Sequence, residues 1–214
     1  HADHLSAAAY LKDKTGAPTA IGEKIVEVQK IWRDIYNDGD FPTDGKQWDK
    51  LFADGATFSI GALPARIMLT PGHTRASITY VIGDAAFVND TLFQPDTGSA
   101  RCDFPGGNAE AQYDSIMAIL ALPQATRLFT GHDYRANGRK PAWESTVAEQ
   151  WASSIHFKNK PDRDEYVRLR LARDKTLAMP RLILHALQFN LRGGRLPPPE
   201  SDGRSYFKIP VNYF

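Results

Sequence analysis

Apolar positions recur at helical spacing in two stretches near the start of the chain. From Leu5 to Lys14 they recur at intervals of three or four, and Gly16 follows as a helix-ending residue. From Glu23 to Tyr36 the same spacing predicts a second, amphipathic helix. A short strand is expected in APTAIG between them. The Gly-, Asp- and Pro-rich stretch NDGDFPTDGKQWD predicts a loop.

The middle of the chain changes to short β-type runs. ATFSIG, PARIMLT, SITYVIG and AAFVND are separated by turn residues, which predicts an antiparallel meander. Helical spacing returns from Asn108 to Leu120, and TRLFTGHDY is typical of a strand that runs into a loop. After Pro141 the pattern is mostly helical, first in WESTVAEQWASSIHF and then in DRDEYVRLRLARDKTLAM. The tail RGGRLPPPESDGRSYF predicts a loop or extended segment, and the mixed order of elements predicts a layered α+β domain.

Length and composition agree with one globular domain over residues 1–214. Hydrophobic residues make up 42% and charged residues 24% of the chain, and 26 basic against 25 acidic side chains give a net charge of +1. This balance implies neither a broad basic surface for nucleic acid nor a broad acidic one, so we expect no nucleic-acid partner. No apolar run approaches the roughly 20 residues of a membrane span. The single cysteine, Cys102, indicates a reducing compartment, so we expect a cytoplasmic protein.

Three candidate metal ligands stand where predicted strands end. His73 lies in TPGHT, Asp90 ends AAFVND, and His132 lies in LFTGHDY. Side chains at strand ends can converge on one point although they are far apart in sequence. Imidazole and carboxylate together suit borderline transition metals such as zinc and iron. Each residue alone has an ordinary interpretation, since PGHT is a common turn and Asp90 could cap a helix.

The first residues of the chain add further candidates. His1 and His4 flank Asp3 directly before the first predicted helix. His1 also has a trivial interpretation, as the remnant of an expression tag. His156 and His185 lie in the helical C-terminal part without such neighbours, and we expect them to be structural.

Taken together, HADH, PGHT, an Asp at a strand end and GHDY resemble the ligand series of the metallo-β-lactamase superfamily. The first motif of that family is H-x-H-x-D-H, of which this chain supplies only the latter part. The resemblance implies an αββα sandwich with its metal at one edge. It also implies that the N-terminal portion of the first sheet is missing from this chain, and that a C-terminal extension, residues 180–214, packs on the domain.

Within the superfamily, VNDTLFQPDTGSARCDFPGG and ARDKTLAMPRLILHALQFNLRGGRLPPP resemble the persulfide dioxygenase branch, in particular its bacterial β-lactamase-hydrolase-like members. The resemblance implies one Fe(II) per chain, with zinc as the alternative, and oxidation of glutathione persulfide by O2 to sulfite and glutathione. His73 and Asp90 match two of the three ligands. The position of the first ligand precedes residue 1, so His1 is the candidate substitute. The residues implied to assist catalysis are His1, Asp3, His4 and His132.

The resemblance also places Arg101 and Tyr134 near the glutathione moiety, where the guanidinium fork suits a carboxylate. The alternative for Arg101 is an ion pair with Asp103 or Asp96. Members of the family often form dimers, although no surface pattern in this sequence indicates one.

Two residues near these motifs have their own interpretations. Cys102 could take part in sulfur transfer, but a lone cysteine is usually a small buried residue, and we favour that interpretation. Asn89 stands where many members of the superfamily have glycine, which predicts an altered turn before Asp90 and leaves the carboxylate in place.

Two rival functions remain. The first is a glyoxalase II-like thioester hydrolase with two zinc ions, in which a metal-bound hydroxide attacks the thioester. The ligands of its two metals would be His1, His73, Asp3, His4 and His132, with Asp90 as the bridge. The second rival is an inactive fragment of such an enzyme.

Overall fold

The computed structural model describes residues 1–213, and the chain divides into two compact units. One unit contains residues 1–51 together with the segment that begins at Leu177, and the other is Phe52–Thr176. A single domain with residues 180–214 as a packed extension stays a prediction. Within the described residues, no helix combines the length and the apolar character that a membrane crossing needs.

The first unit is built from helices and one small sheet. Its elements are α1 (Ala8–Thr15), β1 (Ala20–Gly22), α2 (Ile25–Ile35), β2 (Lys50–Phe52, which ends at the boundary) and α6 (Ile183–Asn190). β1 pairs with β2, and the left-handed Gly16 ends α1. The hydroxyl of Tyr36 donates to the carbonyl of Leu184 at 3.0 Å, which ties the end of α2 to α6. The two predicted helices and the strand between them are therefore confirmed.

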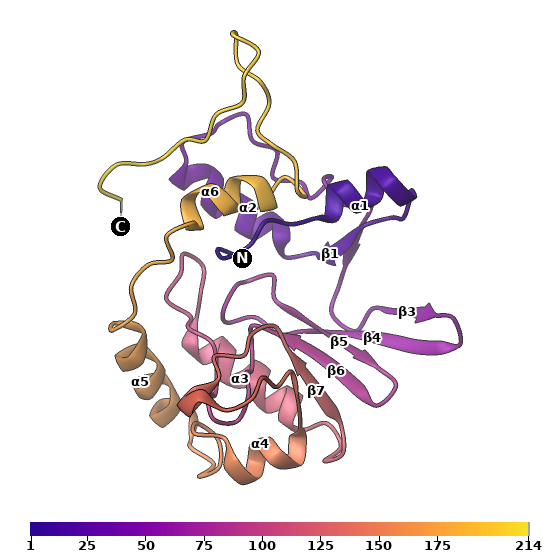
Figure 1. Cartoon of the computed structure of the whole chain (residues 1–214), viewed down its shortest axis with the longest axis vertical. Helices are drawn as coiled ribbons and strands as arrows, with labels where there is room; N and C mark the ends of the chain where they lie inside the picture. Colours follow the sequence, from indigo (N-terminus) through magenta and orange to yellow (C-terminus); the bar gives the residue numbers. More distant parts are fainter. Residues whose placement is uncertain (214) are drawn as a thin grey trace. The chain divides into compact units, whose positions relative to one another are not determined.

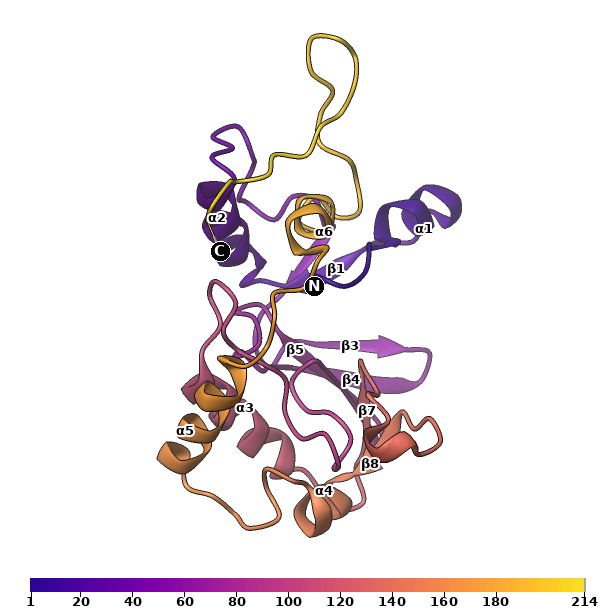
Figure 2. The same ribbon diagram turned by 60° about the vertical axis from the view of Figure 1, so that its left-hand side comes forward.

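The second unit contains a six-stranded mixed sheet. In spatial order its strands are β3 (Thr57–Ile60), β4 (Leu63–Leu69), β5 (Ile78–Ile82), β6 (Ala85–Asn89), β7 (Arg127–Thr130) and β8 (Glu144–Thr146). The first four strands form the predicted antiparallel meander. β7 then pairs parallel to β6, and β8 pairs antiparallel to β7. Figure 1 and Figure 2 show this sheet in two views that differ by a 60° turn.

β8 corrects the expectation of helix throughout WESTVAEQWASSIHF. Residues Glu144–Thr146 pair with β7, and α4 begins only at Val147 (Val147–Ser153). A capping box marks the start of α4, because Thr146 Oγ1 accepts from Glu149 N at 3.1 Å and Thr146 N donates to Glu149 Oε2 at 2.7 Å. Residues 144–146 are extended because they pair with the edge of β7. The hydrophobic pattern within one segment carries no information about such a partner.

Three helices cover one face of the large sheet: α3 (Ala109–Leu120), α4 and α5 (Arg163–Asp174), as both views of the ribbon show. α3 is the helix predicted from Asn108, whose side chain caps it by accepting from Ala111 N at 2.7 Å. The core between sheet and helices is apolar and includes Ala86, Val88, Leu92, Ile116, Ile119, Leu128, Val147 and Tyr166. This core fixes the helix layer on the sheet.

The strand directions place the candidate ligands at one edge of the sheet. β4 and β6 are both antiparallel to β5, so they run the same way, and β7 is parallel to β6. The C-terminal ends of these three strands therefore lie at the same edge. His73 follows β4, Asp90 follows β6 directly, and His132 follows β7.

Candidate metal site

Asp90 lies between two histidines. Its Oδ2 is 3.8 Å from Nε2 of His73 and 3.4 Å from Nε2 of His132. The ligand atoms of His73 and Asp90 lie within 4.8 Å of each other, and both residues are buried. Imidazole nitrogens grouped around one carboxylate form a donor set that Fe(II) and Zn(II) both accept. The structure thus brings together the three strand-end residues that the sequence singled out, and their roles as ligands and catalytic groups stay predictions.

The ring of His73 is held in the orientation that a ligand needs. Its Nδ1 lies 2.7 Å from the carbonyl oxygen of Arg101, and a carbonyl only accepts, so Nδ1 carries the proton and donates. Nε2 therefore keeps its lone pair on the side of Asp90. The ring also makes an edge contact with Phe104, at 5.5 Å between centroids. The residues present fit a metal ion of the kind expected for this site.

The backbone conformation before Asp90 explains why asparagine can occupy residue 89, where many members of the superfamily are expected to have glycine. Asn89 has a φ of 54°, in the left-handed region that asparagine tolerates better than most residues other than glycine. The β6–β7 register shifts between Phe87 and Asn89. Gly131 N then donates to the carbonyl of Asn89 at 3.2 Å. This irregular turn delivers Asp90 to the edge of the sheet, so the carboxylate is in place as expected.

The loop that carries His132 is held by charges. Arg139 Nη2 lies 2.6 Å from Oδ1 of Asp133, and its guanidinium also binds Asp96. Asp133 Oδ2 accepts from Ala142 N at 2.7 Å. These hydrogen bonds, chiefly those from Arg139, hold the pKa of both carboxyl groups below the usual range. Sequence reasoning missed this cluster; the only signal was an Asp inside GHDY, and nothing marked Arg139 as its partner.

Arg101 adopts the alternative that the sequence left open. Its Nε and Nη2 bind the two carboxylate oxygens of Asp103 at 2.7 and 2.8 Å, and its guanidinium lies 4.6 Å from the centre of the Phe104 ring. Asp96, the other expected partner, is engaged by Arg139. Tyr134 is 63% exposed and its ring stacks on His132 at 5.7 Å. The roles of Arg101 and Tyr134 in binding substrate stay predictions.

The candidates at the start of the chain belong to the first unit. Nδ1 of His4 lies 3.2 Å from Oδ1 of Asp3, and the rings of His1 and His4 are 5.7 Å apart. Nδ2 of Asn190 donates to the carbonyl oxygens of His1 and His4 at 2.8 and 3.0 Å, which ties them to the end of α6. Their roles in metal binding and catalysis stay predictions.

Cys102 is buried, as expected for a structural cysteine. Burial raises the pKa of its thiol to about 12, and the neighbouring Asp174 carboxylate acts in the same direction. The thiol donates weakly to Asp174 Oδ2 at 3.5 Å. A thiol that stays protonated at neutral pH is a poor nucleophile, which argues against a direct part in sulfur transfer.

His156, expected to be structural, anchors the chain near the site. Its Nδ1 accepts a hydrogen bond from Ser99 N at 3.0 Å, which requires the neutral ring. Burial, followed by the positive charges of Arg170 and Arg173, lowers the pKa of His156 to about 4 from the ordinary 6.5. The unfolded chain therefore binds more protons than the folded one between these values. The contribution to stability is fully present above about pH 6.5 and is lost as the pH falls toward 4.

We expect His156→Asn to reduce this pH dependence, because an amide oxygen can accept from Ser99 N without titrating. The free energy of unfolding of the unsubstituted protein, measured with urea, should fall by roughly 3 kcal/mol between pH 6.5 and 4 because of His156. The variant should not show that part of the decrease. His185→Asn, which alters an exposed histidine, is the control and should retain the full slope. Equal slopes for all three proteins would contradict the prediction.

Comparisons with known proteins agree with this geometry. A model of the metallo-beta-lactamase superfamily matches residues 1–132. A beta-lactamase hydrolase-like protein of Agrobacterium fabrum is 62% identical over 212 residues, which cover 99% of this chain and 49% of that protein. Glyoxylase B2 of Dictyostelium discoideum is 49% identical over 216 residues, covering 100% of this chain and 74% of that protein.

Solved structures give the same result. The crystal structure of ETHE1 from Myxococcus xanthus superimposes with a TM-score of 0.71 at 27% identity, covering 91% of this chain and 74% of that one. The predicted mixed α+β fold is therefore confirmed. The chain spans about half the length of the beta-lactamase hydrolase-like relatives that it matches.

Proposed function

Because the chain belongs to the metallo-beta-lactamase superfamily, we propose that it acts as an iron-dependent persulfide dioxygenase. The reaction would oxidise glutathione persulfide with O2 to sulfite and glutathione. The observation that carries the proposal is the buried pair of His73 and Asp90, with the His73 ring held so that Nε2 faces the carboxylate. The stretch GSARCDFPGG and the likeness to ETHE1 support this branch of the superfamily over others.

His73 and Asp90 would hold the iron, with His1 as the third ligand that the sequence suggests. Fe(II) held there would supply the redox chemistry that lets O2 react with sulfur. The protein then has to orient the ligands and the substrate. Arg101 performs the first task through its backbone, because its carbonyl accepts from His73 Nδ1.

The side chains around His132 would orient the substrate. The rings of His132, Phe93 and Tyr134 contact one another, at 5.9 Å (His132–Phe93), 5.7 Å (His132–Tyr134) and 5.4 Å (Phe93–Tyr134) between centroids. Nε2 of His132 faces Asp90. Tyr134 presents an exposed aromatic surface beside the site. Arg101 is already held by Asp103, so a glutathione carboxylate would bind it in competition with that pair.

A second candidate is a glyoxalase II-like zinc thioester hydrolase. It is favoured by the position of His132, because one carboxylate oxygen of Asp90 lies within 4 Å of imidazoles on two different strand ends. Such a carboxylate can bridge two metal ions. The similarity to Glyoxylase B2 over the whole chain points the same way.

Metal analysis and oxygen uptake distinguish the two. We expect freshly purified protein to hold about one iron per chain and to consume O2 when glutathione persulfide is added, with sulfite as the product. Two zinc ions per chain, no oxygen uptake, and hydrolysis of a glutathione thioester would replace the dioxygenase with the hydrolase. Loss of oxygen uptake in the His73→Ala variant links the activity to this site.

A further inference from the structure

The segment Ser99–Cys102 carries the carbonyl group that orients His73. That carbonyl belongs to Arg101 and accepts from Nδ1 of His73 at 2.7 Å. Its position decides which ring nitrogen carries the proton and which faces Asp90. The orientation of the candidate ligand therefore depends on what holds this segment in place.

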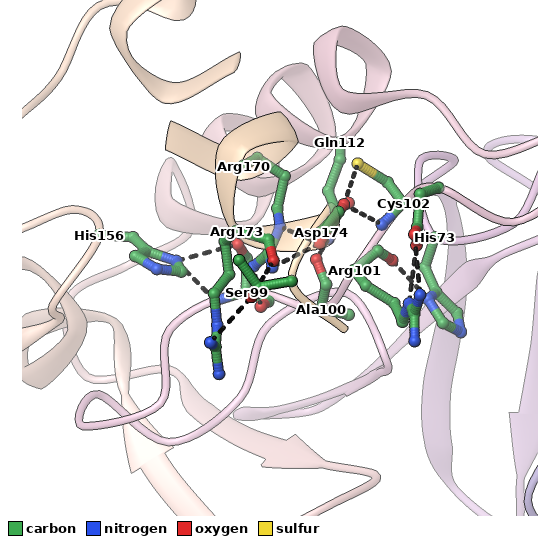
Figure 3. Close-up of polar contacts among 12 residues, drawn as sticks. His73, Ser99, Ala100, Arg101, Cys102, Gln112, His156, Arg170, Arg173 and Asp174 are labelled. Carbon is green, nitrogen blue, oxygen red and sulfur yellow. Dashed lines mark hydrogen bonds and ion pairs between the residues drawn. The ribbon is translucent and has the colours of Figure 1, made fainter. Parts of the chain in front are cut away.

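Two side chains of α5 hold the ends of the segment. Arg170 Nη1 donates to the carbonyl of Ser99 at 2.9 Å, and Asp174 Oδ2 accepts from the amide of Cys102 at 2.9 Å. Arg101 lies between these two anchors, so its peptide groups have little freedom to rotate. Figure 3 shows both α5 side chains reaching the segment on the side away from the His73 ring.

Other residues complete the attachment of the segment. Gln112 on α3 donates through Nε2 to the carbonyl of Ala100 at 2.9 Å. The hydroxyl of Tyr166 on α5 donates to Ser99 Oγ at 2.8 Å. Successive residues are thus bound from the helix layer, which is itself fixed on the sheet by the apolar core.

Arg170 and Asp174 form an ion pair that stability alone does not explain. Nε of Arg170 lies 2.9 Å from Oδ1 of Asp174, and the two side chains are only 4% and 1% exposed. The free-energy cost of removing two charges from water offsets much of the favourable energy of their attraction. A protein with a well-packed apolar pair in their place is often equally stable. What an apolar pair lacks is the ability to bind the backbone of Ser99 and Cys102. The pair is therefore suited to fixing a position.

We propose that Arg170 and Asp174 are positioning residues of the metal site. By holding Ser99 and Cys102 they fix the Arg101 carbonyl, which selects the Nδ1–H form of His73 and leaves Nε2 for the metal. The inference rests on the proposed function only in treating His73 as a ligand.

The tautomer of His73 in metal-free protein tests the proposal directly. Long-range 1H–15N spectra at about pH 8, where a free imidazole is neutral, should show the proton on Nδ1 in the unsubstituted protein. The signal is assigned by its absence in His73→Gln. In Asp174→Asn the amide oxygen cannot accept from both Cys102 and Arg170, and its NH2 group faces donors. We expect a mixture of tautomers or the Nε2–H form.

Metal affinity gives the second readout. Competition titration with Co(II) and a chromophoric chelator should show Asp174→Asn binding roughly 10- to 100-fold more weakly, the usual effect of losing a group that orients a metal ligand. Arg170→Lys keeps the charge but loses the guanidinium group that binds both Asp174 and the Ser99 carbonyl. It should also shift the His73 tautomer and weaken Co(II) binding. It carries the test if Asp174→Asn does not fold. Asp114→Asn is the matched control, since that carboxylate pairs with Arg163 of α5 at 2.9 Å on the exposed surface.

A purely structural role would give a different result. Ile116→Ala removes a fully buried core side chain of α3 and supplies a destabilised reference. The proposal is wrong if Asp174→Asn and Arg170→Lys lose stability but have the same His73 tautomer and the same Co(II) affinity as Ile116→Ala. Neither readout uses a persulfide. Shifts in both without any dioxygenase activity would refute the proposed function and leave the positioning role standing.

Discussion

Asp90→Asn should lower the affinity for Co(II) and Zn(II) by more than about 100-fold. Losing a residue that only orients a ligand usually costs up to about 100-fold, and losing a ligand should cost more. Asp90 supplies a negative charge and two lone-pair-rich oxygens to the site, and Oδ2 lies near both His73 and His132. An amide keeps the shape but loses the charge and turns one oxygen into a donor. Oxygen uptake with glutathione persulfide should fall with the metal content.

The control for Asp90→Asn is the same change at Asp84. That carboxylate lies on the turn between β5 and β6 and its side chain is 76% exposed. Asp84→Asn should bind metal within twofold of the unsubstituted protein, an expected difference smaller than about 0.5 kcal/mol. An Asp90→Asn protein that retains its metal through dialysis at the level of the control would show that the site lies elsewhere.

Gly131→Ala should weaken metal binding roughly 10- to 100-fold although no ligand is removed. A Cβ at residue 131 would lie 2.5 Å from Oδ1 of Asp90 and 3.4 Å from Oδ1 of Asn89. Because Gly131 N also donates to the carbonyl of Asn89, the backbone cannot retreat without losing that bond. We expect the Asp90 carboxylate to turn away from its observed position. The strain should also cost about 1–3 kcal/mol of unfolding free energy, as overpacking commonly does.

Gly39→Ala provides the matched comparison. A Cβ there meets nothing within 4 Å, and the residue does not have a left-handed φ. Its unfolding free energy should rise by a few tenths of a kcal/mol or stay constant, because alanine restricts the unfolded chain. Co(II) titration and urea unfolding of both variants make the test. Equal metal affinity in the two proteins would mean that Asp90 has room to accommodate the added methyl group.

Much of the fold follows from local patterns. The short β-type runs and turn residues of residues 56–90 predicted the antiparallel meander, and helical spacing from Asn108 predicted α3. Both signals lie within a few neighbouring residues of the chain. β8 was missed since its pairing partner, β7, supplies the reason for its conformation. The strand-end placement of His73, Asp90 and His132 was also readable, and the structure brings these residues together.

The sequence by itself therefore determined the family, the order of the main elements and the residues that gather at one edge of the sheet. Only the tertiary structure decided how those residues are held. Arg170 and Asp174 stand four residues apart in a charged helix, a pattern typical of an exposed ion pair. They are buried because the chain some 70 residues earlier lies against them. Hydrogen bonds between distant segments produce no periodic pattern in the sequence. An Arg or Asp that binds distant backbone looks the same in the sequence as one that is exposed to solvent.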